Sequence, residues 1–84
     1  MIVFVTGATA GFGLAIARRF AADGARVVAA GRRRDRLDAL VAELGEDRAH
    51  ALPLDVSDRE AVAASVASLP DAFAAVGVLV NNAG

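Results

Sequence analysis

A glycine-rich segment, Thr6-Gly7-Ala8-Thr9-Ala10-Gly11-Phe12-Gly13, connects an apolar run at residues 2–5 to a helical pattern. Gly7 can adopt the backbone conformation of a sharp turn, and Gly11 presents no side chain where a ligand's phosphates would approach the main chain. Gly13 lets the helix pack close to the strand. The first turn of a helix has unpaired N–H groups and a partial positive charge. We therefore predict that an anionic ligand, a pyrophosphate, contacts the turn residues Gly7, Ala8, Thr9, Ala10, Gly11, Phe12 and Gly13.

The spacing of the glycines leaves an alternative open. They stand at i, i+4 and i+6 rather than in the G-x-G-x-x-G pattern, so the segment alone also fits a flexible turn rich in Gly and Ala. The apolar run before it and the helical pattern after it favour the binding turn. Within the turn, we expect Phe12 to cover the strand rather than to stack on a ligand ring.

Composition limits the class of protein. With 84 residues, 56% of them hydrophobic and 23% charged, the chain predicts one small domain with a densely buried sheet rather than a disordered segment. The sequence has no cysteine, which excludes disulfides and thiolate zinc sites. A net charge of −1 disfavours general nucleic-acid binding. Residues 72–80, the longest apolar run, are far fewer than the roughly 20 residues of a membrane helix.

The N-terminus bears on the compartment. Met1 is followed at once by strand-like residues, without a basic segment. We therefore expect a cytoplasmic protein that lacks a secretory signal.

The first half of the chain alternates helical and strand patterns. Apolar residues at helical spacing after the turn predict a helix that ends at Gly24, and the continuously apolar residues 27–30 predict a strand covered on both faces. A second amphipathic helix ends at Gly45. Its apolar stripe consists of Leu37, Leu40, Val41 and Leu44. Strands connected through a helix pair in parallel, with a right-handed crossover.

The second half adds a strand at residues 49–54 and another at residues 78–80. The first of these contains Pro53, which lacks the N–H that a central ladder needs, so this strand should lie at a sheet edge. Strands alternating with helices, with the glycine turn after the first strand, predict an α/β fold. Specifically, we predict a Rossmann-like, doubly wound parallel sheet with the strand order 3-2-1-4.

One helix and one turn are expected between these last two strands. Ser57 followed three residues later by Glu60 has the spacing of a capping box, so we expect a helix from there to Pro70. A turn through Asp71 then leads toward the final strand.

Ligands of such sheets bind beyond the carboxyl ends of the strands, where the winding reverses. The predicted binding edge therefore combines the turn at residues 6–13 with residues 31–33, 54–56 and 81–84. Asp55 is placed to accept a hydrogen bond from an adenine amino group, or it merely ends the strand. Asn81 and Asn82 bind the cofactor or brace the sheet, with a simple turn pair as the alternative. The other predicted contacts at these strand ends are Leu54, Ala83 and Gly84.

Arginines follow the second predicted strand. An NAD site usually has an acidic residue about 20 residues beyond the glycines, where it holds the ribose 2′-hydroxyl. Here Gly31 is followed by Arg32 and Arg33, whose guanidinium groups can bind a 2′-phosphate that a carboxylate would repel. We therefore predict NADP as the cofactor. The alternative is a solvated helix start formed by the arginines at 32, 33, 34 and 36, although positive charge there opposes the helix dipole.

Together these motifs resemble those of the short-chain dehydrogenase/reductase family. Residues 6–13 match its T-G-x-x-x-G-x-G motif, Asp55 its adenine-contacting Asp, and residues 81–84 its N-N-A-G motif, so the resemblance covers the whole chain. Within the family, the sequence is similar to bacterial NADP-dependent 3-hydroxy acid dehydrogenases, which oxidise serine and L-allo-threonine. The resemblance implies hydride transfer between NADP and a hydroxyl carbon of a small-molecule substrate, and a homo-oligomer.

The resemblance also implies a catalytic Tyr and Lys, helped by a Ser and an Asn, downstream of N-N-A-G. This chain contains neither tyrosine nor lysine, so no catalytic residue is assigned to it. We therefore expect residues 1–84 to be the NADP-binding Rossmann half-domain of a larger enzyme, with residues 78–80 as a bare apolar edge that favours association. Two alternatives stay open: a non-catalytic NADP-binding or sensor module, and an interaction domain that binds no nucleotide.

Overall fold

The computed structural model describes residues 1–55 and 57–81. In chain order, the helices and strands are β1 (Ile2–Thr6), α1 (Gly11–Ala22), β2 (Arg26–Gly31), α2 (Arg34–Leu44), β3 (Ala49–Pro53), α3 (Arg59–Ala67), α4 (Asp71–Ala74) and β4 (Val78–Val80). The predictions made for Val56, Asn82, Ala83 and Gly84 lie outside the described residues.

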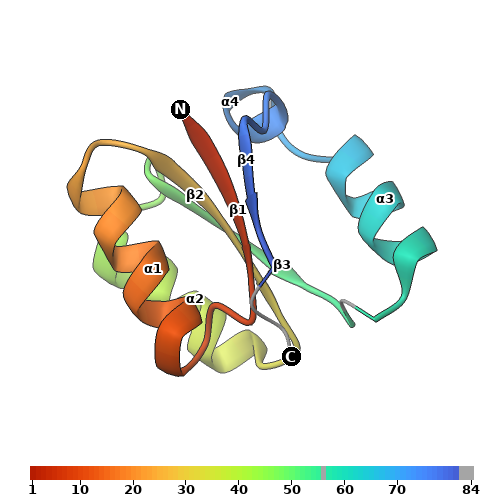
Figure 1. The fold of residues 1–84 in the computed structure, drawn as a ribbon, viewed down its shortest axis with the longest axis horizontal. Helices are drawn as coiled ribbons and strands as arrows, with labels where there is room; N and C mark the ends of the chain where they lie inside the picture. The colour runs from red at the N-terminus through yellow and green to blue at the C-terminus, as the bar shows by residue number, and fades with distance from the viewer. Residues whose placement is uncertain (56, 82–84) are drawn as a thin grey trace.

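The strands form one parallel sheet in the order β3-β2-β1-β4, which confirms the prediction. In the register of this sheet, Val3 of β1 is level with Val27 of β2 and Val78 of β4. Helices α1 and α2 cover one face of the sheet and α3 and α4 lie on the other (Figure 1). Pro53 is the last residue of the edge strand β3, as its missing N–H requires.

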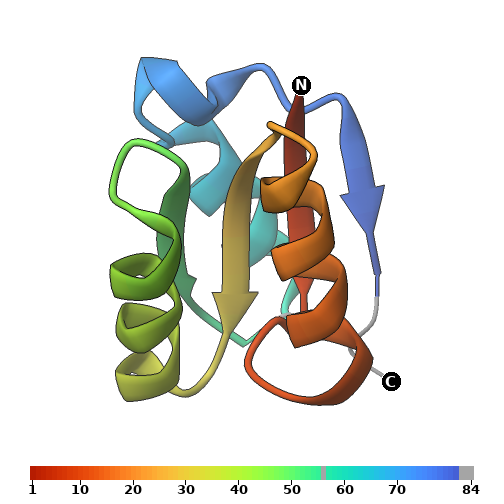
Figure 2. The same cartoon turned by 90° about the vertical axis from the view of Figure 1, so that its left-hand side faces the viewer.

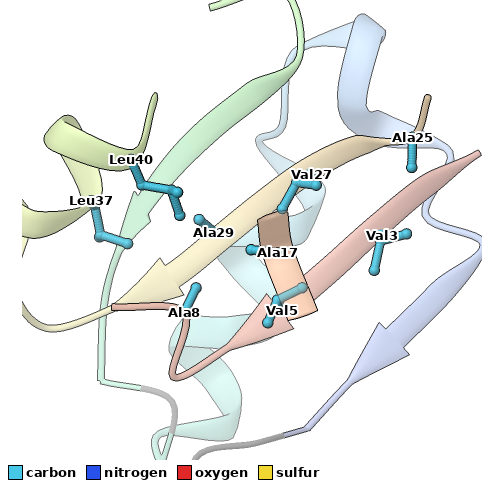
Figure 3. Close-up of a cluster of buried hydrophobic side chains, with 9 residues drawn as sticks. All are labelled: Val3, Val5, Ala8, Ala17, Ala25, Val27, Ala29, Leu37 and Leu40. Carbon is cyan, nitrogen blue, oxygen red and sulfur yellow. The ribbon is translucent and has the colours of Figure 1, made fainter. Parts of the chain in front are cut away.

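The two central strands are buried on both faces, because successive side chains of a strand point to opposite sides. Val3, Val5 and Val27 belong to a cluster with Ala17 of α1 and Leu37 of α2 (Figure 3). The cluster on the opposite face consists of Phe4, Val28, Ala30, Leu69 and Phe73. This double burial explains why residues 27–30 are apolar without interruption.

Glycines end the first two helices as predicted. After α1, Gly24 has φ of +92°, and its amide donates to the Ala21 carbonyl at 3.0 Å. After α2, Gly45 has φ of +100°, and its amide donates to the Val41 carbonyl at 2.7 Å. A residue with a side chain rarely adopts these conformations, so both positions require glycine.

The start of α3 differs from the prediction. Its N-cap is Asp58, whose carboxylate accepts a hydrogen bond from the Ala61 amide at 3.1 Å. Ser57 instead donates to Asp55, so the capping box of Ser57 and Glu60 is wrong. Ser and Asp are comparable N-caps, and sequence spacing alone does not choose between neighbours.

Two further boundaries need correction. Helix α3 ends at Ala67 rather than at Pro70, because Leu69 leaves the helix to join the core beside Phe73. The expected turn through Asp71 is the short helix α4, which begins directly after Pro70. Proline is favourable just before or at the start of a helix, because it needs no N–H partner there.

We expect Asp58→Ala to lower the free energy of unfolding by about 0.5–2 kcal/mol, the usual cost of losing an N-cap. Glu60→Ala is the matched control, because Glu60 lies in the same first turn without making the cap hydrogen bond. Urea unfolding of both variants measures the difference. If Glu60→Ala lowered the free energy of unfolding as much as Asp58→Ala, or more, the capping box of Ser57 and Glu60 would be supported instead.

One sheet edge is apolar. Strand β4 pairs with β1 along one side, and its Leu79 side chain is 65% exposed.

None of the helices within residues 1–55 and 57–81 combines the length and the apolar character that crossing a membrane requires.

Candidate nucleotide-binding site

Loops from different parts of the chain meet at the carboxyl edge of the sheet. The strands are parallel, so their carboxyl ends lie together, and Figure 2 shows the arrowheads of β1, β2 and β3 at one edge beside the start of α1. The predicted residues at this edge that the structure describes are Gly7, Ala8, Thr9, Ala10, Gly11, Phe12, Gly13, Arg32, Arg33, Leu54, Asp55 and Asn81. The edge is therefore the place to test for a ligand.

The glycine turn has the backbone that its sequence predicts. Gly7 has φ of +62° and Gly11 has φ of +57°, both in the left-handed region that favours glycine. The buried Ala8 donates its amide to the Ala30 carbonyl of β2 at 3.3 Å, which anchors the turn to the sheet. Apart from the two neighbouring residues and the backbone of α1 itself, a Cβ atom on Gly11 would meet no atom of the described residues within 4 Å. The open space at Gly11 fits the close approach of a ligand.

Helix α1 starts without a side-chain cap. Its N-cap is Ala10, which has no side-chain acceptor, and the first turn carries no acidic residue. The amides of this turn thus lack the partner that Ser, Asp or Asn would supply at most helix starts. Unsatisfied amides and the positive end of the helix dipole make such a terminus suitable for an anionic group.

Phe12 does not cover the strand, so that expectation is wrong. Its side chain is 81% exposed, whereas the neighbouring Gly13 is buried. The first turn of α1 lets Gly13 face the sheet, and Phe12 then points away from it. Phe12 therefore presents an apolar ring at the rim of the turn.

Gly31 has a role that the sequence analysis did not assign. A Cβ atom on Gly31 would lie 3.3 Å from Cγ2 of Thr9, tighter than ordinary van der Waals contact. Gly31 thus lets the turn after β1 pack against the end of β2. The sequence does carry a signal for this role, because Gly31 ends a buried strand. Glycine at such a position often allows another chain segment to approach closely.

The ends of β2 and β3 are connected by an ion pair. Nη2 of Arg32 lies 3.2 Å from Oδ2 of Asp55. The Asp55 Oδ1 atom accepts hydrogen bonds from the Ser57 amide at 3.0 Å and from the Ser57 hydroxyl at 2.7 Å. The Leu54 amide also donates to the Gly31 carbonyl at 2.9 Å. These contacts hold two predicted site residues, Arg32 and Asp55, against each other.

The pKa of Asp55 is lowered from 3.8 to about 2. The hydroxyl of Ser57 is the main cause, followed by the Ser57 amide and then the Arg32 guanidinium, since all three favour the ionised carboxylate. Because the pKa is lower in the folded state, ionised Asp55 stabilises the fold above about pH 3.8, and this contribution is lost as the pH falls toward 2.

We expect Ser57→Ala to raise the pKa of Asp55 toward its ordinary value, and to raise it more than Arg32→Ala does. The hydroxyl hydrogen bond is the larger of the two influences on the carboxylate. Titration of the Asp55 carboxyl carbon by NMR measures both variants against the unchanged chain. A larger rise in Arg32→Ala would show that the ion pair, not Ser57, holds the carboxylate ionised.

The other arginines of the cluster differ from Arg32. Arg34 forms an i,i+4 pair with Asp38, in which Nε and Oδ2 are 3.6 Å apart. Within residues 1–55 and 57–81, no carboxylate lies within 4.0 Å of the guanidinium groups of Arg33 and Arg36. Arg33 is the exposed N-cap of α2, so its side chain can turn toward a ligand at the end of β2.

Thr6 and Asn81 connect the ends of β1 and β4. Oγ1 of Thr6 lies 3.3 Å from the Val80 carbonyl and 3.2 Å from Oδ1 of Asn81. This favours the bracing role that the sequence analysis considered for Asn81. A hollow of about 330 Å³ adjoins this point, and its lining consists of Thr6, Arg59, Val62, Ala63, Leu79 and Asn81.

The polar groups at the carboxyl edge of the sheet are mainly backbone amides and arginine side chains. No group of three or more His, Cys, Asp or Glu side chains within them could hold a metal ion. His50, the single histidine, lies in β3 with its ring 5.5 Å from that of Phe73, as an ordinary strand residue would. The site thus offers amides and guanidinium groups, which suit phosphates.

A parallel sheet of this strand order, with a glycine-rich turn between β1 and α1, defines the Rossmann-like class of α/β proteins. The chain belongs to the short chain dehydrogenase family, whose match extends over residues 1–84. The family resemblance inferred from the sequence motifs is confirmed.

Individual relatives are similar over nearly the whole chain. The NADP-dependent 3-hydroxy acid dehydrogenase YdfG of Salmonella typhi is 57% identical over 84 residues, which are 100% of this chain and 34% of that protein. Serine 3-dehydrogenase of Agrobacterium fabrum is 49% identical over 82 residues, 98% of this chain and 32% of that protein. The solved closed form of serine dehydrogenase complexed with NADP+ is 52% identical, with a TM-score of 0.94 over 100% of this chain and 34% of that chain. The chain spans about a third of the length of these relatives.

Proposed function

We propose that residues 1–84 are the NADP-binding half-domain of an oxidoreductase. The complete enzyme would transfer a hydride between NADP(H) and a hydroxy acid or another small alcohol or carbonyl substrate. The observation that carries this proposal is the combination of an open, uncapped glycine turn with Arg32 at the end of the neighbouring strand. Amides at a helix start suit a pyrophosphate, and a guanidinium suits a 2′-phosphate.

The residues of this chain fit the cofactor at separate points. The turn amides would bind the pyrophosphate, with the open side of Gly11 admitting it to the main chain. Arg32 and Arg33 would bind the 2′-phosphate, and Leu54 and Asp55 would flank the adenine. Asn81, Ala83 and Gly84 would complete the site beyond β4. Bound NADPH would supply the hydride, or bound NADP+ would accept it, while the residues of this chain would hold and orient the cofactor.

The rest of the activity would depend on residues outside this chain. The sequence contains no tyrosine and no lysine for the proton transfer that accompanies hydride transfer. The relatives named for hydroxy acids and serine support a small hydroxy-acid substrate. We also propose that the complete protein forms a homo-oligomer in the cytoplasm and binds neither nucleic acid nor a membrane.

Calorimetric titration of the chain with NADPH and with NADH tests the cofactor. We expect measurable binding of NADPH and weaker binding of NADH, because the second ligand lacks the 2′-phosphate. Circular dichroism first establishes that the preparation is folded. Equal affinities, or tighter binding of NADH, would overturn the choice of cofactor.

A non-catalytic NADP-binding module is the second candidate. The lack of tyrosine and lysine favours it for the chain by itself. Both candidates predict NADPH binding, but they differ in a chimera in which residues 1–84 replace the matched third of the Salmonella typhi relative. The rest of that relative supplies the catalytic residues, so turnover requires residues 1–84 to hold NADP in the orientation that hydride transfer needs. Reduction of NADP with a hydroxy-acid substrate supports the enzyme half-domain, and binding of NADP without turnover supports the sensor module.

A further inference from the structure

Arg32 is held by a side chain from the next strand end. Its side chain is 74% exposed, and a long exposed arginine would ordinarily sample many rotamers. The contact between Nη2 and Oδ2 of Asp55 at 3.2 Å favours the orientation in which the guanidinium lies beside the end of β3. Asp55 is therefore placed to decide where the guanidinium of Arg32 points.

Asp55 is itself fixed on the opposite side of its carboxylate. Oδ1 accepts both hydrogen bonds of Ser57, which leaves Oδ2 facing Arg32. The main chain around the pair is also constrained, because Leu54 donates to Gly31 and Asp58 donates to the Asp55 carbonyl at 3.1 Å. The pair thus lies between two anchored strand ends rather than between two free side chains.

Both members of the pair keep unused hydrogen-bonding capacity. A guanidinium has five N–H donors, and the contact with Asp55 engages Nη2, so donors remain for a phosphate. A carboxylate has about four acceptor sites, of which Ser57 and Arg32 occupy three, so one remains for an adenine amino group. One carboxylate can therefore contact the base and orient the arginine beside it.

We propose that Asp55 is a positioning residue for 2′-phosphate recognition: it holds the Arg32 guanidinium in place for the phosphate, and Ser57 fixes the carboxylate that does so. The proposal rests on the function proposed above, in which Arg32 binds the 2′-phosphate. Its consequence is that Asp55 favours NADP over NAD although its own charge would repel a phosphate. Positioning lowers the entropy lost on binding, and this outweighs the repulsion.

The ratio of NADPH affinity to NADH affinity separates this role from adenine contact. Both cofactors carry the same adenine, so loss of a base contact lowers both affinities equally and leaves the ratio unchanged. We expect Asp55→Asn to lower the ratio about 5-fold, a common size for coupling between neighbouring side chains. Ser57→Ala should also lower the ratio, by about 2-fold, because the Asp55 carboxylate stays but is held less firmly.

A double-mutant cycle with Arg32→Ala tests whether Asp55 acts through the arginine. In the Arg32→Ala background, Asp55→Asn should no longer lower the ratio, because only the repulsion between the Asp55 carboxylate and the phosphate remains to be removed. Asp38→Asn is the matched control, because it breaks an Arg–Asp pair on α2 with the same change of charge, at Arg34 rather than at Arg32. It should leave the ratio unchanged.

The ratio is measured by titration of the chain and, in parallel, as kcat/KM for NADP over NAD in the chimera with the Salmonella typhi relative. The second measurement serves if a variant of the chain alone fails to fold. An unchanged or raised ratio in Asp55→Asn overturns the positioning role, as does the same fall in Asp38→Asn. A ratio unaffected by Arg32→Ala instead overturns the proposed function, so the two failures are distinguishable.

Discussion

Arg32→Ala is expected to weaken NADPH binding by about 1.5–3 kcal/mol, the range for a hydrogen bond to a charged group. The reason is the loss of a guanidinium at the end of β2, where Asp55 already orients it. The binding free energy of NADH should fall much less, because NADH has only a hydroxyl at the same ribose carbon. In equilibrium terms the loss for NADPH is a factor of roughly 10 to 150.

Calorimetry on the variant with both cofactors measures this effect. Arg19→Ala is the matched control, because it removes the same charge from an exposed position on α1, where Arg19 pairs with Asp23. A general electrostatic effect would weaken NADPH binding similarly in both variants. If Arg32→Ala lowered the affinities for NADPH and NADH equally, Arg32 would not bind the 2′-phosphate.

Phe4→Ala is expected to lower the free energy of unfolding by about 3–5 kcal/mol, as large-to-small changes in a core do. Phe4 is 1% exposed in the interior strand β1, and it packs with Val28, Leu69 and Phe73. Such a loss is a large part of the roughly 5–15 kcal/mol that stabilise an average domain. We therefore expect the variant to unfold at a much lower urea concentration than the unchanged chain.

Urea unfolding followed by circular dichroism measures the loss. Phe12→Ala removes the same ring from a side chain that is 81% exposed, and it should change the stability by less than about 0.5 kcal/mol. If Phe4→Ala lowered the free energy of unfolding as little as Phe12→Ala does, the face of the sheet covered by α3 and α4 would contribute little to the core.

Strand order was predictable from the sequence because few residues determine it. Pro53 cannot donate to a central ladder, which places its strand at an edge. Gly24 and Gly45 mark helix ends because positive φ values exclude most other residues. The glycine turn and the arginines after residue 31 were likewise placed at one edge by the rule for parallel sheets.

Other features depend on side-chain geometry that spacing does not contain. Ser57 and Asp58 are both suitable N-caps, and only the fold shows that Asp58 caps α3 while Ser57 binds Asp55. The pair of Arg32 and Asp55 arises because Gly31 and Pro53 are level in the sheet, which brings the residues that follow them together. No pattern within one strand predicts a contact between two loops.

The most direct test of the proposed cofactor site is amide chemical-shift mapping of the isotopically labelled chain during titration with NADPH. We expect the largest shifts on the turn from Gly7 to Gly13 and on Arg32 and Asp55, at the carboxyl edge of the sheet. Shifts centred instead on Gly24 and Gly45, at the opposite edge, or no shifts at saturating NADPH with a folded chain, would contradict it.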